Sequence, residues 1–259
     1  MLNNKAITSV FNARVFIILI ETLVIYLLYS YFHIHLKIDF TIISIAIVFP
    51  LVFSITSAYQ RRQESITTFA EFRNKLIDLS NIFYAVNNIT KEDYNRLYSE
   101  LMDVQKLLVD YMKNAETGNT FDLIRKKRKT ILILIDSYKS NFNEREKDSL
   151  IHVKNELFLS AEKLRGLKIH ETPISLRKYC LIFIYLSPLL YDSQLVPDQY
   201  AFGTNLETMI SLFFSMLVSF VLMALYNVQE YIENPFDQKG LDDLKIHEME
   251  VSSWESLVE

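Results

Sequence analysis

Cysteine, glycine and tryptophan are scarce in this chain of 259 residues. Cys180 is the only cysteine, which excludes an intrachain disulfide and a cysteine-based metal site, and we expect it to be a small apolar residue near a helix start. The glycines Gly118, Gly166, Gly203 and Gly240 all fall between segments with helical patterns. This distribution predicts an almost wholly α-helical fold.

Apolar residues, by contrast, make up 50% of the chain. They form four long runs, at residues 15–32, 40–58, 179–191 and 206–226. About 20 residues of helix cross roughly 30 Å of hydrocarbon. The third run is short and contains Pro188, so we expect it to be broken or tilted, which membrane helices tolerate when a neighbour satisfies the freed carbonyl. The runs predict a multi-pass membrane protein with four transmembrane helices and exclude a soluble enzyme.

Basic residues are almost absent from two of the predicted loops. Of the 27 Lys and Arg residues, only Lys37 lies in the loops 33–39 and 192–205. The positive-inside rule therefore places both termini and residues 60–176 in the cytoplasm. No small-residue cleavage site follows the first run, so we expect an anchor and not a cleaved signal peptide.

The region between the two pairs of runs has helix-start signals. Thr90 with Asp93, and Asn143 with Glu146, have the spacing of capping boxes. No glycine or proline interrupts residues 51–86, which predicts one helix of roughly 70 Å over residues 40–86. The apolar run 131–135 fits a strand by periodicity, and its helical surroundings favour a helix. We expect a cytosolic bundle of about four helices, one of whose apolar faces carries Leu150, Val153, Leu157, Ala161 and Leu164.

These segments divide the chain into four predicted parts: an N-terminal transmembrane pair (1–59), a cytosolic helical region (60–176), a C-terminal transmembrane pair (177–232) and an acidic cytosolic tail (233–259).

The second apolar run has three large apolar side chains at four-residue spacing, Ile45, Phe49 and Phe53. This spacing places them on one stripe of a helix. Either the stripe packs against other helices or lipid, or it lines a pore. Pro50 weakens the helical hydrogen bond to the carbonyl of Ala46, which is compatible with a kink that serves gating and with a tolerated proline in a packed helix.

Few polar residues interrupt the spans or stand out beside them. Glu21 lies deep in the first run, where a structural hydrogen bond is favoured over a role in an ion path. His33 and His35 are interpreted as surface histidines because no third ligand is nearby. The basic run 125–129 indicates a solvated face or a contact with anionic lipid, and not nucleic-acid binding.

Two short motifs resemble one family. Residues 58–64, Ala-Tyr-Gln-Arg-Arg-Gln-Glu, resemble the A-Y-D-R-W-W-E motif of bacterial bestrophins, and residues 233–236, Glu-Asn-Pro-Phe, resemble the E-D-P-F-G or I-N-P-F-G signature of the same family. Thr172-Pro173 and Leu186-Ser187-Pro188 fit the bacterial branch as well. The chain departs from these motifs at Arg62, Gln63 and Asp237.

The resemblance implies an ion channel: a homopentamer in the bacterial inner membrane, whose second spans surround one axial pore. It implies that Ile45, Phe49 and Phe53 form an apolar neck, which stops conduction when its water column empties. The motif residues with implied structural roles are Tyr59, Arg61, Glu64, Asn234, Pro235 and Phe236.

The ion selectivity is predicted from the charged residues of the outer loops. The predicted outer loops carry Asp39, Asp192, Asp198 and Glu207 against Lys37, which favours monovalent cations slightly over chloride or other anions.

Animal bestrophins bind calcium with an acidic cluster after the last span. Calcium takes six to eight oxygen ligands, and Lys239 interrupts the sparser cluster of Asp237, Asp242 and Asp243. We therefore expect no cofactor and no tight calcium site, and we expect the tail to dock on a neighbouring subunit.

The alternative function is a membrane signalling or receptor protein whose cytosolic helices contact a partner. A histidine-kinase form is disfavoured, because residues 60–176 lack the glycine-rich motifs that ATP binding needs. No catalytic residues are proposed.

Overall fold

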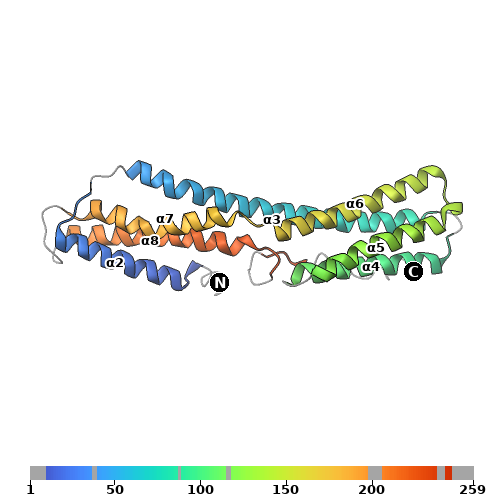
Figure 1. Ribbon diagram of the computed structural model, residues 1–259, viewed down its shortest axis with the longest axis horizontal. Coiled ribbons are helices and arrows are strands. Elements are labelled where there is room, and N and C mark those ends of the chain that lie inside the picture. Colours follow the sequence, from blue (N-terminus) through green and yellow to red (C-terminus); the bar gives the residue numbers. More distant parts are fainter. Residues whose placement is uncertain are drawn as a thin grey trace. The chain divides into compact units, whose positions relative to one another are not determined.

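The computed structural model describes residues 10–36, 40–86, 89–114, 118–197, 206–237 and 243–246. Their regular structure is entirely helical (Figure 1). The elements are α2 (Ala13–Phe32), α3 (Phe40–Tyr84), α4 (Lys91–Lys113), α5 (Gly118–Ser137), η1 (Lys139–Asn141), α6 (Glu144–Ile169), α7 (Ile174–Leu195) and α8 (Leu206–Glu233). The predicted roles of Lys37, Asp39, Asp198, Lys239 and Asp242 fall outside the described residues.

The chain divides into two compact units. Unit 1 comprises Met1–Gln60 and Glu171–Glu233, and unit 2 comprises Arg61–His170 and Asn234–Glu259. Helix α3 contributes to both units. Its span of Phe40–Tyr84 confirms the long helix predicted over residues 40–86.

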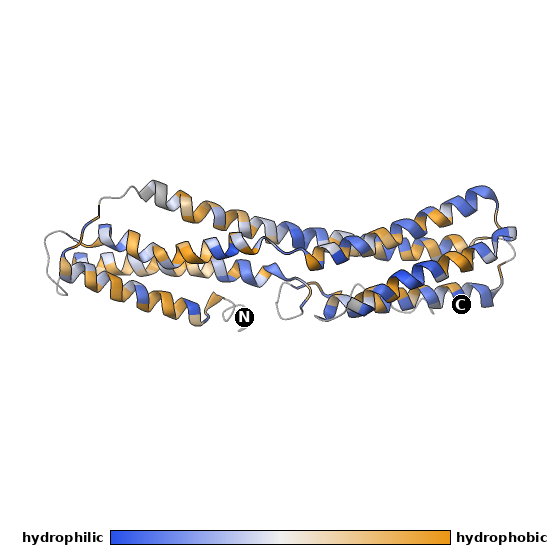
Figure 2. Ribbon diagram, in the orientation of Figure 1, coloured by the Kyte–Doolittle hydropathy of each residue, from blue (hydrophilic) through white to orange (hydrophobic). Residues whose placement is uncertain are grey.

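Unit 1 is built on α2, α7 and α8, each of which packs against the other two. Their shared core includes Ile18, Ile184 and Met223, and α3 adds Ile47 and Leu51 to it. Figure 2 shows α2, α7 and α8 as largely apolar along their length. This core is what holds the first part of α3 to the other three helices.

Three described helical stretches are long and apolar enough to cross a membrane, which makes the chain a membrane protein. They are Ala13–Phe32, a part of Glu144–Leu195, and Leu206–Glu233. The first part of α3 is not among these three, so the fourth span stays a prediction. The third apolar run was expected to be broken or tilted. A break is wrong, because α7 is continuous over 22 residues.

Both intrahelical prolines of unit 1 have their freed carbonyls satisfied by hydroxyl groups. Pro188 does not break α7, because Ser187 Oγ donates to the Ile184 carbonyl at 2.7 Å. In α3, the carbonyl of Ala46, four residues before Pro50, accepts from the Tyr179 hydroxyl at 3.4 Å. The prediction that a neighbour replaces the lost backbone donor is therefore confirmed.

Unit 2 is a bundle of the second part of α3 with α4, α5 and α6. Both predicted capping boxes are present, with Thr90 and Asn143 as the N-caps of α4 and α6. The apolar face predicted for residues 150–164 is buried in the core, and residues 131–135 lie within α5. The bundle of about four helices expected from the sequence is thus present, and its cytosolic location stays a prediction.

The prediction that glycines fall between helices was wrong at two described positions, because Gly118 is the first residue of α5 and Gly166 is internal to α6. Gly203 and Gly240 lie outside the described residues. Gly166 lies inside α6, three residues before the end of that helix, instead of between helices. A Cβ added at this position would meet nothing within 4 Å. No close approach requires glycine here, and the helix tolerates it at a cost of about 1 kcal/mol relative to alanine.

The described part of the acidic tail packs on its own chain. Phe236, Leu244 and Ile246 are all at most 3% exposed and belong to the core of unit 2. The Leu244 amide donates to the Pro235 carbonyl at 2.8 Å. The expectation that the tail docks on a neighbouring subunit is therefore wrong for these residues.

Candidate functional site

The first part of α3 has two different faces. Ile47, Leu51, Ser54 and Ala58 are at most 1% exposed and pack within unit 1. The predicted neck residues lie on another face, with exposed fractions of 57% for Ile45, 60% for Phe49 and 60% for Phe53. The stripe therefore does not serve the packing of this chain.

The two phenylalanines of the stripe touch each other. Their ring centroids are 5.1 Å apart with an interplanar angle of 72°, an edge-to-face arrangement. Val48 and Val52 beside them are also exposed. The exposed face is apolar, so in the assembled protein it is covered by lipid or by other copies, or it lines a narrow path for ions.

The motif at the end of this segment contains one buried basic residue. Arg61 is 8% exposed, and its Nε donates to the Leu167 carbonyl at 2.9 Å. That carbonyl lies in the last turn of α6, where helical carbonyls lack backbone donors. Tyr59 and Glu64 are both exposed. Arg61 thus ties α3 to the C-terminus of α6 within unit 2.

The second motif begins directly after α8. Asn234 Oδ1 accepts from the Phe236 amide at 3.2 Å, which shapes the turn at Pro235, and the Phe236 ring enters the core of unit 2. The motif residues Asn234, Pro235 and Phe236 thus form the turn that connects the end of α8 to a buried anchor.

Glu233, one residue earlier, is buried in unit 1. Its carboxylate accepts from the Thr172 amide at 2.7 Å and from Gln229 Nε2 at 3.0 Å. Thr172 precedes α7, so the acid lies at the N-terminal end of that helix, where a negative charge is favourable.

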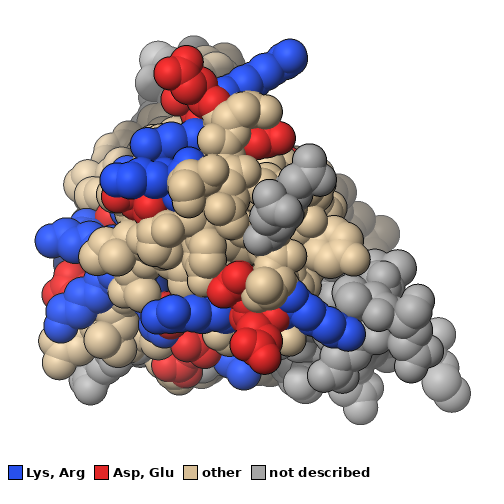
Figure 3. Space-filling model, turned by 90° about the vertical axis from the view of Figure 1, so that its right-hand side faces the viewer, with Lys and Arg blue, Asp and Glu red and all other residues tan. Residues whose placement is uncertain are grey.

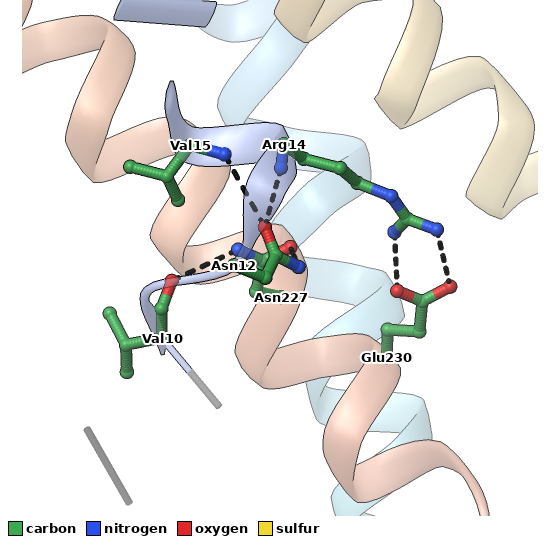
Figure 4. A network of polar contacts seen from close by, with 6 residues as sticks. All are labelled: Val10, Asn12, Arg14, Val15, Asn227 and Glu230. Carbon is green, nitrogen blue, oxygen red and sulfur yellow. Dashed lines mark hydrogen bonds and ion pairs between the residues drawn. The ribbon is translucent and has the colours of Figure 1, made fainter. Parts of the chain in front are cut away.

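Sequence reasoning missed a polar network that joins α2 to α8 (Figure 4). Asn12 caps α2 by accepting from the Arg14 amide at 3.0 Å, and its Nδ2 donates to Asn227 Oδ1 at 2.9 Å. Asn227 in turn donates to the Val10 carbonyl at 3.0 Å, and Arg14 pairs with Glu230 through both carboxylate oxygens. The available signal was polar residues three apart, Asn227 and Glu230, near the end of an apolar run.

Two further candidate residues, Glu21 and His33, lie in α2 and at its C-terminal end. Glu21 is half-buried, and no hydrogen bond to it is present among the described residues, contrary to the structural bond that was favoured. His33 is exposed and ends α2 in the left-handed conformation, with φ 53°.

Two residues of the basic run 125–129 pair with acids. Arg125 contacts Glu162 at 2.9 Å, and Lys127 contacts Glu100 and Asp103 at 2.9 and 2.7 Å. The end of unit 2 in Figure 3 likewise mixes basic and acidic side chains. These contacts fit a solvated, ion-paired face.

Two residues assigned to the acidic outer loops, Asp192 and Glu207, lie within helices. Asp192 lies inside α7 and is 0% exposed, with Ser215 Oγ donating to its Oδ1. It was predicted as a surface acid because the apolar run was read as ending at Tyr191. Glu207, at the start of α8, is exposed as expected.

The structure resembles solved structures of one kind. A bacterial bestrophin homologue from Klebsiella pneumoniae superposes with a TM-score of 0.75 at 17% identity, over 91% of this chain and 93% of the homologue. A point variant of that homologue gives the same TM-score and coverage at 16% identity. The fold is bestrophin-like. No family model matches the sequence, and no curated protein matches it.

The bestrophin fold covers both units and not the apolar helices alone, because the superposition includes 91% of the chain. The order of elements expected from the two short motifs is therefore the observed order. Identity of 16–17% supports the fold alone. The roles of the motif residues are therefore argued from their contacts within this chain.

Proposed function

We propose that this protein is a pentameric ion channel with one axial pore, lined in its narrow neck by Ile45, Phe49 and Phe53. The observation that carries the proposal is the exposed apolar stripe of α3, opposite a face that is buried in unit 1. In a chain with the bestrophin fold, five such helices around an axis would place fifteen apolar side chains toward one path.

The proposed gate works through hydration. Apolar walls at a radius of a few Å cannot replace the hydration shell of an ion, so a narrow water column between phenylalanine rings empties and conduction stops. The edge contact between Phe49 and Phe53 gives each subunit a two-residue apolar wall. Small helix movements at Pro50 would widen the ring and rewet it.

The proposal includes monovalent conduction with cations favoured over chloride. Its support is the acidic excess in the loops predicted to face outside, to which the exposed Glu207 contributes and the buried Asp192 does not. Membrane insertion with both termini in the cytoplasm of a bacterial cell belongs to the same proposal.

The test is current through purified protein in a planar bilayer under a salt gradient. We expect current, with a reversal potential on the cation side. Changing Phe49 and Phe53 to alanine should raise the open probability, whereas Phe16→Ala, which removes an equally exposed ring from α2, should leave gating unchanged.

Three results would count against parts of the proposal. Absence of current from the wild-type protein would remove the channel function and favour a signalling role. Unchanged gating in the double alanine variant would place the neck elsewhere. A native particle mass other than five copies would contradict the pentamer.

A further inference from the structure

The outer half of the α2–α7–α8 bundle, where α7 ends and α8 begins, contains a carboxylate with no countercharge. Asp192 is 0% exposed. Its Oδ1 accepts from Ser215 on α8, while its Oδ2 is buried and has no hydrogen-bond partner in the described part of the chain. A buried charged oxygen without a partner is unusual in a native structure and calls for a bound group that satisfies it.

No basic side chain of these helices can neutralise Asp192. Their described basic residues are Arg14, Arg177 and Lys178, all at the opposite end of the bundle. Arg14 pairs with Glu230, and Arg177 pairs with Glu171. Lys178 lies fourteen positions before Asp192 on the same helix, which corresponds to roughly 21 Å along its axis.

Ser215, which donates to Asp192, belongs to a row of hydroxyl residues on α8. On α8, Thr208, Ser211 and Ser215 recur at helical spacing on one face, and the Oγ1 of Thr208 is also buried without a partner. From α2, the Tyr26 hydroxyl donates to the Thr208 carbonyl at 3.1 Å. Carboxylate, hydroxyl and carbonyl oxygens are ligands that hard cations prefer.

We propose that the buried Oδ2 oxygen of Asp192, in the bundle of α2, α7 and α8, binds one monovalent alkali cation, Na⁺ or K⁺. One carboxylate neutralises one positive charge, whereas a divalent ion would leave a net charge in an apolar bundle. The hydroxyls of α8 supply further oxygens around the ion. The ion lies within a single subunit and stabilises its helix packing, so this site is independent of the proposed conduction path.

The experiment measures the thermal unfolding of the purified full-length protein in detergent. NaCl replaces choline chloride at constant ionic strength, and the titration is repeated with KCl. Wild-type protein should show a saturable rise in Tm by several degrees with at least one alkali cation, because the ion binds only the folded state. The response should weaken at pH 5, where protons compete for the carboxylate.

Two variants and one control localise the effect. Asp192→Asn should abolish the cation response, and Ser215→Ala should move its midpoint to higher Na⁺ concentration. Glu207→Gln, which neutralises an exposed acid at the same end of α8, should respond like wild type.

A wild-type Tm that is the same in choline, sodium and potassium overturns the proposal, even if Asp192→Asn fails to fold. A Tm that depends on pH through Asp192 but not on the alkali cation also overturns it and assigns a proton to the site. A cation response that persists in Asp192→Asn places the ion elsewhere.

Discussion

Lys154 is buried at 4% exposure in unit 2, although no hydrogen bond or ion pair satisfies it among the described residues. Burial and, secondarily, the nearby Arg128 guanidinium lower the pKa of the Lys154 ammonium. A lowered pKa in the folded state means that the charged form is held at a cost, because the unfolded chain keeps the ordinary value.

We expect Lys154→Met to stabilise the protein on the order of 1 kcal/mol at pH 7, because it removes the buried charge and keeps the volume. As pH rises through the lowered folded pKa toward the unfolded value near 10.4, wild-type Lys154 loses its proton in the folded state and the cost disappears. The gap between the two proteins should therefore narrow. Unfolding of both proteins between pH 7 and pH 10 checks this.

The control for this comparison is Lys163→Met. Lys163 is half-exposed and lies 3.7 Å from Glu71, so its loss should change stability by less than about 0.5 kcal/mol. A Lys154→Met variant that is less stable than wild type would mean that Lys154 has a favourable partner, such as an acid on another copy of the chain.

Residues whose signals are local could be predicted from the sequence, whereas residues whose surroundings come from distant elements could not. Thr90 and Asn143 were identified as caps because the acid that completes each box is three positions away. The burial of Asp192 depends on Ser215, which is 23 positions later in the chain. No pattern around position 192 contains that information.

At the scale of elements, α7 shows how a helix extends beyond its apolar run. Hydropathy indicated residues 179–191, yet the helix spans Ile174–Leu195, because polar residues at both ends find partners. Arg177 pairs with Glu171 at the start, and Asp192 meets α8 near the end. Apolar runs therefore locate the middle of such helices more reliably than their ends.

The continuity of α7 through Pro188 rests on one hydroxyl, and removing it should be costly. Ser187→Ala should destabilise unit 1 by about 1–3 kcal/mol, because the buried Ile184 carbonyl would lose its donor. Pro188→Ala in the same background should recover much of the loss, since alanine restores the backbone N–H. Thermal unfolding of the single and double variants measures this coupling.

Ser193→Ala is a matched control within α7. Ser193 is also buried, and its Oγ donates to the Leu190 carbonyl at 3.1 Å, but residue 194 is not proline and its backbone N–H remains available. We expect a smaller cost than for Ser187→Ala. Equal costs for the two serines would show that the proline has no part in the effect.

At the scale of the whole molecule, two motifs of four to seven residues were enough to predict the bestrophin-like fold. Their order, on either side of a long helical region, restricts the architecture more than either motif does alone. The motifs could not indicate that their neighbouring residues are buried in different units. Glu233 is buried in unit 1, and Phe236, three positions later, is buried in unit 2. The described residues that follow α8 are therefore a structural part of unit 2.

This arrangement predicts different effects for two truncations of the chain. Ending the chain after Glu233 removes Phe236, Leu244 and Ile246 from the core of unit 2, each worth roughly 1.5–3 kcal/mol of burial. Ending it after Ile246 retains all three. We expect the protein that ends after Glu233 to show a lower Tm and faster amide hydrogen exchange in α4, α5 and α6. The protein that ends after Ile246 should stay close to wild type. If both truncations exchange like wild type, the tail contributes no stability to unit 2, and its buried apolar residues are replaceable by rearrangement of the neighbouring core.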